Sequence, residues 1–576
     1  MGRRMISHVA LPAVFLLLAS CVLTESNRQV PQKVVEKIEA MPRMPEPYEV
    51  IDWRKKAVNF DNVVFDFSAE GAYRPLIWLD DAHRNFDQQT FGIYTALGDV
   101  RQGKEVNNGE FHESLASLGA LMSAGLVGID KTDQDGHNYV KMVQNYFNRE
   151  NGWNIMMNNT SPEVAMLGGG YGRDWWYDVY PNLLYYAVSD LFPGTDRADS
   201  LLRIIADQFY RADSVLDGNY DYSYFDYAAM EGKRNHIPFQ QDAAAGHAYV
   251  LYMAYCKFGD PRYLEGAESA LEALLNQPES RFYEVLMPFG AYVAARLNAR
   301  EGTAYTYDSI LDWTFDGCLA EDGRTGWGVI ADQWGDYDVY GMQGSTPVAD
   351  GYGFLMNTFS LAWPLVPMVR YDPRYARAVG KWLLHASSAA RLCYPYHIPD
   401  ENQWLPGKKS VTKNAIAYEG IRENDMYGEE RLAGVSPVAL GDGPRWTEGQ
   451  PDVSMFSIYG SAYAGIFGAI INKTNAPGIL QLDCLATDYY RDDAYPTYLY
   501  FNPYGEAKKI NYKTRNGKVN LYDMITGEVI AEEIQGEGTF TIAGEQVRVI
   551  VEIPAGLEVH QEDGVTRAGD VIVSYF

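Results

Sequence analysis

The chain has 576 residues and a formal net charge of −28, with 48 basic and 76 acidic side chains. Hydrophobic residues make up 47% of it and charged residues 22%, which is the balance of a globular protein with material for more than one core. The electrostatic field of this negative charge repels nucleic acids and anionic membrane surfaces. It therefore excludes nucleic-acid binding and disfavours a long polyanionic ligand.

The first 21 residues, MGRRMISHVALPAVFLLLASC, predict an export signal. Two arginines precede an apolar run that is too short to span a membrane. The ending LASC resembles a bacterial lipobox, which implies cleavage before Cys21, lipid on its sulfur and anchoring in the bacterial cell envelope. Val22 favours the outer membrane by the same resemblance, on its periplasmic face or at the cell surface. The alternative is an ordinary secretory signal in which Cys21 is incidental.

Residues 22–47 are polar and contain several prolines, which predicts a flexible tether between the lipid and the folded part. From residue 48 to about 472 the pattern is helical, because apolar residues recur at three-to-four spacing. The clearest helical stretches are 109–130, 182–192, 200–216, 243–259 and 281–300.

A short internal repeat, DPRY, occurs at 260–263 and again at 372–375. In each copy the aspartate is placed to cap a helix and the proline to occupy its first turn, where it costs no hydrogen bond. Helical hairpins that recur in this way predict a closed toroid or a solenoid.

After residue 472 the periodicity changes from helix to strand. Alternating segments broken by glycine-rich turns predict a small antiparallel β domain over 473–576. Within it, 547–551 reads as a central strand and 570–576 as an edge strand.

Four long loops are rich in glycine, aromatic and charged residues, and we expect them to lie together around the opening of one cleft. They are residues 168–178, 219–242, 322–353 and 418–430. Aromatic faces stack on the apolar faces of pyranose rings, and a pair of carboxyl groups with separated pKa values is what cleavage of a glycosidic bond needs. The loops therefore predict a sugar-binding cleft.

The predicted catalytic carboxylates are Asp174, Glu231 and Asp242. Each has a structural alternative: Asp174 as the cap of a helix that begins at Trp175, Glu231 as part of an exposed salt-bridge turn, and Asp242 as an N-cap. Glu419 is a further possible acid; the alternative is that its neighbour Arg422 simply pairs with Glu423 or Glu419 on the surface.

The predicted substrate-binding residues are Tyr171, Arg173, Trp175, Arg234, His236 and Trp334. The basic members would hold a sugar carboxylate and the tryptophans would stack on the ring. Trp327 is a second stacking candidate. His247 lies among alanines and is interpreted as a core histidine.

No cofactor or metal is predicted. Asp336 and Asp338 flank Tyr337 like a calcium ligand pair, but the further ligands of an EF-hand loop are missing. The sequence also lacks a GxSxG elbow, a phosphate loop, a dinucleotide-binding motif after a strand, and HExxH.

Segments at 52–67 (DWRKKAVNFDNVVFDF), 74–92 (RPLIWLDDAHRNFDQQTFG), 172–178 (GRDWWYD) and 498–504 (YLYFNPY) resemble glycoside hydrolase family 154 β-glucuronidases of bacterial polysaccharide-degrading lipoproteins. The resemblance implies a mainly α fold, an (α/α)₆ toroid over 48–472, followed by the β domain. It also implies an exo-acting hydrolase on a terminal uronic sugar, a β-glucuronide, of a plant or marine polysaccharide.

Two other functions stay open at this point. One is a polysaccharide lyase, in which Tyr171, Tyr227 or His236 removes the proton beside a uronate. The other is a glycan-binding lipoprotein without catalysis. In each case the partner is an oligo- or polysaccharide, and the membrane is reached only through the N-terminal lipid. The sequence sets no oligomeric state and allows a homodimer.

Overall fold

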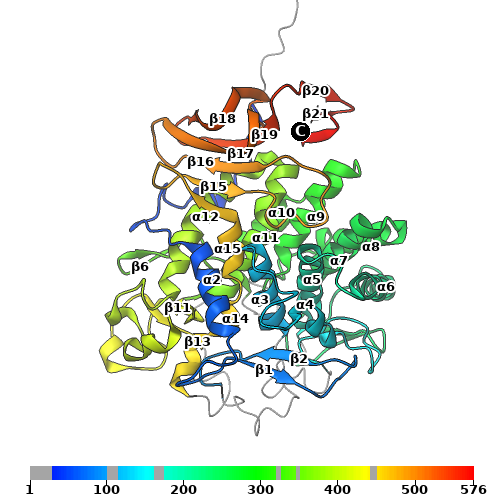
Figure 1. The fold of residues 1–576 in the computed structure, drawn as a ribbon, viewed down its shortest axis with the longest axis vertical. Coiled ribbons are helices and arrows are strands. Elements are labelled where there is room, and N and C mark those ends of the chain that lie inside the picture. Colours follow the sequence, from blue (N-terminus) through cyan, green and yellow to red (C-terminus); the bar gives the residue numbers. More distant parts are fainter. Residues whose placement is uncertain (1–28, 100–113, 161–173, 319–325, 346–350, 442–450) are drawn as a thin grey trace, which may run out of the picture.

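The computed structural model describes residues 29–99, 114–160, 174–318, 326–345, 351–441 and 451–576. Helices dominate the chain up to about residue 470, and antiparallel strands dominate the remainder. In Figure 1 the strands of the C-terminal region, in orange and red, lie over one end of the helical body.

Six of the described helices pack in a closed series, each against the next, with the last returning to the first. They are α3 (Ser114–Leu126), α5 (Trp175–Leu191), α7 (Ala243–Phe258), α9 (Met287–Arg300), α11 (Leu355–Tyr371) and α15 (Ala464–Ile470). Most of their residues are buried on every side, as expected of helices with neighbours on both flanks. Closure of the series corresponds to a ring and not to an open solenoid.

A second set of helices covers the outside of the ring. It comprises α2 (Trp53–Val64), α6 (Ala198–Leu216), α8 (Pro261–Leu275), α10 (Asp308–Asp316) and α12 (Ala376–Ala389), with the short α1 (Glu36–Glu39), α4 (Tyr139–Met142) and α14 (Ile458–Ser461) between elements. These helices are amphipathic: α6 buries Leu201, Ile205 and Phe209 on one face against α7 and α8. The caps predicted at DPRY form, because Asp260 and Asp372 each accept a bond from the backbone N–H two residues on.

A five-stranded antiparallel sheet is built from two of the loops that precede ring helices. Its order is β12 (Val438–Leu440), β11 (Gly420–Arg422), β9 (Tyr352–Phe354), β8 (Gln343–Ser345) and β5 (Trp327–Val329). The register pairs Trp327 with Ser345, Ser345 with Tyr352, and Tyr352 with Arg422, which puts these side chains on one face. The sequence predicts only loops here, since each strand is three residues long.

Four two-stranded antiparallel sheets complete the helical region, and the first three are hairpins. They are β1 (Ile77–Asp80) with β2 (Thr90–Ile93), β3 (Tyr224–Asp226) with β4 (Glu231–Lys233), β6 (Gln333–Trp334) with β7 (Tyr337–Asp338), and β10 (Ala417–Tyr418) with β13 (Phe456–Ser457).

The C-terminal region forms two antiparallel sheets. The larger has the order β14 (Ile471–Lys473), β15 (Leu480–Asp483), β16 (Thr497–Phe501), β19 (Val547–Pro554), β17 (Lys508–Asp523) and β18 (Glu528–Ile542). The smaller contains β20 (Val559–Glu562), β21 (Val565–Ala568) and β22 (Val571–Ser574). β19 lies inside the larger sheet, and β14 follows α15 directly, so the C-terminal end of the ring adjoins this region.

Residues 29–47 do not behave as the free tether that the sequence predicts. Val35, Ile38 and Met41 are buried, and α1 packs against α10 and α12. The backbone N–H of Val30 also donates to the carbonyl of Ile525 in the β region. Apolar side chains at three-residue spacing make this packing possible despite the polar composition of the segment.

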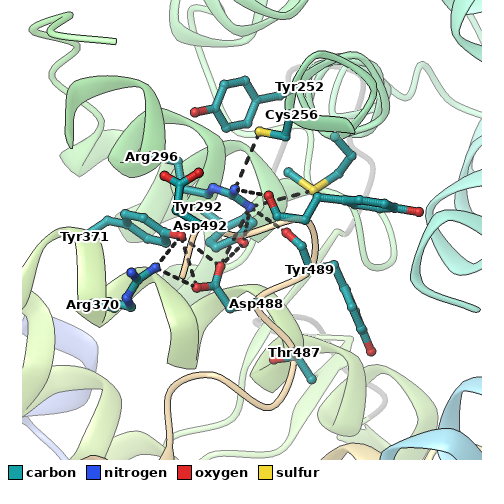
Figure 2. A network of polar contacts seen from close by, with 12 residues as sticks. Tyr252, Cys256, Tyr292, Arg296, Arg370, Tyr371, Thr487, Asp488, Tyr489 and Asp492 are labelled. Carbon is teal, nitrogen blue, oxygen red and sulfur yellow. Dashed lines mark hydrogen bonds and ion pairs between the residues drawn. The ribbon is translucent and has the colours of Figure 1, made fainter. Parts of the chain in front are cut away.

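A buried ion-pair network closes the end of the ring that adjoins the β region (Figure 2). Asp488 lies between Arg370, whose Nη1 is 3.1 Å from Oδ2, and Arg296, whose Nη1 is 3.7 Å from Oδ1. The Tyr292 and Tyr371 hydroxyls donate to the same carboxylate. The linker between β15 and β16 is therefore fastened to α9 and α11.

The same linker also contacts α5. The Tyr490 hydroxyl donates to the carbonyl of Tyr186 near the C-terminal end of that helix, and Arg296 donates to the carbonyls of Tyr489 and Tyr490. Together these bonds attach the linker to the C-terminal halves of α5, α9 and α11. Within the described ranges, no helix has the length and apolar character of a membrane span.

Candidate functional site

The segments that precede the ring helices are tied to one another by side-chain hydrogen bonds at the N-terminal end of the ring. Gln240, just before α7, donates from Nε2 to Asp174 Oδ1 at 2.9 Å and accepts from the backbone N–H of Trp176. Asp242 Oδ2 accepts from the backbone N–H of Tyr283, in the segment before α9. These bonds bring the starts of α5, α7 and α9 together.

Asp174 and Asp242 thus lie in the predicted region, at the N-cap positions of α5 and α7. Neither side chain makes the N-cap hydrogen bond of its own helix. Asp174 is 3% exposed and Asp242 is fully buried, and both accept bonds from neighbouring segments. Their observed contacts join the segments that precede α5, α7 and α9.

Glu284 is a partly exposed carboxylate in the segment before α9. Its Oε2 accepts a hydrogen bond from Nδ2 of Asn357 at 2.7 Å. Asn357 is buried in the first turn of α11, and Gln343 of β8 donates to the Glu284 carbonyl. The carboxylate is therefore held at the N-terminus of α11, where the helix dipole favours negative charge.

Glu419 is a second partly exposed carboxylate, immediately before β11. Its carbonyl accepts from the backbone N–H of Leu355, the first residue of α11, and its N–H donates to Met455. Its Oε1 accepts a hydrogen bond from the Tyr459 hydroxyl at 2.5 Å. Both Glu284 and Glu419 are thus fastened to the first turn of α11, one by its side chain and one by its backbone.

Burial raises the pKa of Tyr459 well above its usual value, and the negative charge of Glu419 raises it further. The phenol therefore stays protonated at neutral pH and acts as a donor to Glu419. Tyr352 and Tyr177 lie close enough to Tyr459 to raise the same pKa.

Aromatic rings adjoin the two carboxylates. The Phe354 ring lies 5.7 Å from Trp327 and 6.0 Å from Tyr459, centroid to centroid. Trp327 and Tyr459 are partly exposed, as is Tyr177 on α5. We call the group Glu284, Trp327, Phe354, Glu419 and Tyr459 the α11 pole.

A buried guanidinium lies on the same face of the five-stranded sheet. Arg422 stacks over the Tyr352 ring with its Cζ 4.2 Å from the ring centre, and it is paired in register with that residue. Tyr352 in turn stacks against Phe354 at 5.9 Å. The sheet therefore places a cation three residues from Glu419 along the chain and beside the aromatic rings of the pole.

Two carboxylates held by neutral donors beside flat apolar rings are the elements that acid–base cleavage of a glycosidic bond requires. Within the described ranges, no group of three or more His, Cys, Asp or Glu side chains is placed to hold a metal ion.

Other predicted site residues lie away from the α11 pole. Glu231 is 61% exposed on the β3–β4 hairpin and pairs with Lys233, whose hydrogen bond lowers the pKa of the Glu231 carboxyl. The observed contact is that of the exposed salt-bridge turn. Arg234 and His236 are exposed just after it, and Arg234 lies 4.6 Å from the Phe239 ring.

The two predicted stacking tryptophans are buried. Trp175 has no exposed surface, donates from Nε1 to the Tyr227 hydroxyl and stacks on Tyr220 at 5.4 Å. Trp334 is 3% exposed in β6. The Trp175 indole presents no face to a ligand, because Tyr220 and Phe225 stack on it. Trp334 is too buried to offer its ring face to a ligand in this structure. Tyr171, Arg173 and Cys21 lie outside the described residues.

Tyr227 does not fit a lyase base. It is fully buried, its hydroxyl is 2.8 Å from Nε2 of His247, and burial raises its pKa well above the usual value. His247 is the core histidine that the sequence predicts, and burial lowers its pKa to about 3.

Sequence reasoning named Glu419 and Trp327 but missed Glu284 and Tyr459. Glu284 falls in the stretch 281–300, which reads as one helix, whereas α9 begins only at Met287. Pro288 was the available signal, since proline is favoured in the first turn and marks a helix start.

No protein-family model matches the chain. The search of curated proteins also gives no match. The chain is similar to several solved structures of glycoside hydrolases, all at low identity. One is a GH127 β-L-arabinofuranosidase from Geobacillus stearothermophilus T6, with 11% identity, 91% of this chain and 85% of that chain covered, and a TM-score of 0.36.

Two further structures show comparable similarity. One is a mutant unsaturated glucuronyl hydrolase from Streptococcus agalactiae, with 13% identity, coverage of 76% and 97%, and a TM-score of 0.35. The other is the endoglucanase CelQ from Clostridium thermocellum, with 12% identity, coverage of 92% and 99%, and a TM-score of 0.34. Similarity at this level does not decide an activity, so the functional argument rests on the chain's own residues.

Proposed function

We propose that this chain is a glycosidase whose catalytic carboxylates are Glu284 and Glu419. The observation that carries the proposal is their common attachment to the first turn of α11, with each side chain accepting a bond from a neutral donor. Trp327 is partly exposed and supplies an apolar ring face beside them, which suits the apolar face of a sugar, and the buried Phe354 packs behind it.

The two carboxylates accept hydrogen bonds from different donors, and this difference suggests their roles. A short bond from a phenol to a carboxylate is charge-assisted and favours the ionised form. Glu419, which accepts from Tyr459 at 2.5 Å, is therefore proposed as the base or nucleophile. Glu284, which accepts from an amide, is proposed as the acid that protonates the leaving oxygen.

The fold proposed for this activity is an (α/α)₆ toroid, in which the closed series of ring helices is paired with the outer set. Because the linker and its Asp488 network cover one end of the ring, a glycan would enter from the N-terminal end. Lipidation at Cys21 would hold the enzyme at the bacterial envelope with its polysaccharide substrate.

The sugar is proposed to be a uronic acid, as the resemblance to family 154 β-glucuronidases implies. Arg422, on the sheet face that carries Tyr352, is the basic residue proposed to bind the carboxylate in place of the exposed Arg234 and His236.

The test is hydrolysis of a panel of nitrophenyl glycosides that includes glucuronides, galacturonides, arabinofuranosides and neutral hexosides. We expect release of nitrophenol from a uronide, and a loss of about 10²- to 10⁴-fold in kcat for Glu419→Gln and Glu284→Gln. Glu231→Gln is the matched control and should keep full activity.

Two results would count against the proposal. An ultraviolet-absorbing unsaturated product from a uronate polymer indicates a lyase. Glycan binding without turnover, unchanged in both glutamine variants, indicates a binding protein.

A further inference from the structure

A cavity of about 410 Å³ lies between the N-terminal segment and α12. Its lining includes Lys33 and Glu39 from the N-terminal side, Arg377 and Lys381 from α12, and Gln546 from the turn before β19. α12 starts after the C-terminal end of α11, so this cavity is remote from the α11 pole. Its volume is in the range of small-molecule sites, roughly 300 to 1,000 Å³.

The cavity lining carries more positive than negative side chains, whereas the whole chain is negatively charged. Lys33, Arg377 and Lys381 carry positive charge there and Glu39 is the acidic member, in a protein with a net charge of −28. A concentration of cations in a concave site attracts anions locally. The lining also carries neutral amides, including Gln546, whose side-chain oxygen accepts from Gln29.

Two of the three cations already have carboxylate partners. Lys33 lies 2.5 Å from Asp308. Arg377 lies 2.9 Å from Glu39 and also donates to the carbonyl of Glu545. Their charges are largely compensated by the protein itself.

Lys381 differs from both. Its Nζ donates to the backbone carbonyl of Glu39 at 2.9 Å, and among the described residues no carboxylate lies within ion-pair distance of it. The side chain is only 4% exposed, and burial lowers its pKa. The carboxylates of Glu39 and Glu545 act on this ammonium only from beyond ion-pair distance, so an anion bound in direct contact would offset the cost of burying it.

We propose that this cavity binds a small oxyanion-bearing molecule, with the Lys381 ammonium as the principal contact and Arg377 one helical turn away as the second. The Lys381 ammonium retains hydrogens beyond the one given to Glu39, which suits an oxygen of a phosphate or a carboxylate. The site is independent of the proposed glycosidase activity.

Calorimetric titration of the full chain with inorganic phosphate and, separately, with D-glucuronate tests the site. We expect saturable binding of at least one anion, weakened roughly tenfold or more in Lys381→Met and retained in Lys381→Arg, because the charge-assisted contact is lost in the first and kept in the second. Lys408→Met, at an exposed lysine, is the matched control and should bind as the parent does.

The two anions separate the ligand classes. Binding of phosphate alone assigns a tetrahedral oxyanion, and binding of glucuronate that is weakened in Lys381→Met assigns a sugar acid to this cavity and not to the site at Arg422. A rise in thermal unfolding temperature with the bound anion should accompany either result. Absence of binding by both anions, or equal affinity in the parent and Lys381→Met, overturns the proposal. If the methionine variant unfolds, Lys381→Gln replaces it: this variant keeps a polar side chain without the charge and should show the same loss of binding.

Discussion

The hydroxyl of Tyr459 lies 2.5 Å from Oε1 of Glu419. The two residues are 40 positions apart and come from α14 and the start of β11, so only the folded chain brings them together. Because burial and the Glu419 charge keep the phenol protonated, the bond has a fixed direction from Tyr459 to Glu419. A carboxylate held in this way is oriented and stabilised as an anion.

Removing this hydroxyl should impair turnover without unfolding the protein. We expect Tyr459→Phe to lower kcat by roughly 10- to 100-fold, because a preorganised hydrogen bond to the reacting carboxylate is lost. The acidic limb of the kcat/KM profile should move to higher pH, since the anion loses a donor. Tyr396→Phe, at an exposed tyrosine, should change neither quantity. Loss of activity with an unmoved pH profile would mean that Tyr459 has only a packing role.

Trp327 should contribute to binding more than to chemistry. Its ring is partly exposed and packs at a tilt of 43° against the Phe354 ring of the pole. We expect Trp327→Ala to raise KM roughly tenfold while kcat changes by only a few-fold, the pattern of a uniform binding contact. Trp313→Ala, at a half-buried tryptophan of α10, serves as control. Unchanged KM in Trp327→Ala would remove this residue from the sugar site.

The Asp488 carboxylate should be a main determinant of stability. Asp488→Asn leaves Arg296 and Arg370 buried without their shared anion, which we expect to cost about 3 to 5 kcal/mol of unfolding free energy. Urea unfolding measures the difference. Asp492→Asn breaks only an exposed pair with Arg300 and should cost less than ~1 kcal/mol. Equal losses of unfolding free energy in the two variants would show that the buried network contributes no more to stability than an exposed ion pair.

Because His247 is buried in its neutral form, we expect the protein to lose stability in mild acid. Burial lowers its folded-state pKa from 6.5 to about 3, so between these values the unfolded chain binds a proton that the folded chain does not. Stability from this group therefore falls as pH decreases below 6.5, by ~1.4 kcal/mol per pH unit. At about pH 5 the unfolding free energy should therefore be roughly 2 kcal/mol lower than at neutral pH because of this histidine.

The measurement is the difference in unfolding free energy between about pH 7 and pH 5 in urea. His247→Gln should show a smaller difference than the parent, because glutamine cannot take up the proton. His236→Gln, at an exposed histidine, should keep the parent's full difference. A His247→Gln slope equal to that of the parent would contradict the prediction.

Much of the architecture could be predicted from local patterns in the sequence. The helical periodicity to about residue 470, the change to alternation afterwards and the DPRY caps all depend on neighbours in the chain. Short strands such as β5 and β11 could not be predicted, because three residues carry too little pattern and pair only across long distances.

The candidate site divides in the same way. The residue types in the loops indicated a carboxylate site among aromatic rings, and Glu419 and Trp327 were identifiable there. Local sequence could not distinguish Trp175, an indole in the core, from Trp327, an indole at the pole, since burial is set by which segments pack over each ring. The partnership of Glu284 with Asn357 likewise needs α9 and α11 to be neighbours.

Composition and short-range pattern thus dictate a negatively charged, helical chain with a β-rich end and loops suited to sugars. Which acids face a ligand, which rings are covered and which end of the ring is closed follow only from packing between distant segments. The reason is physical: exposure, hydrogen-bond partners and electrostatic environment are properties of the neighbours in space, and those neighbours are up to hundreds of residues away along the chain.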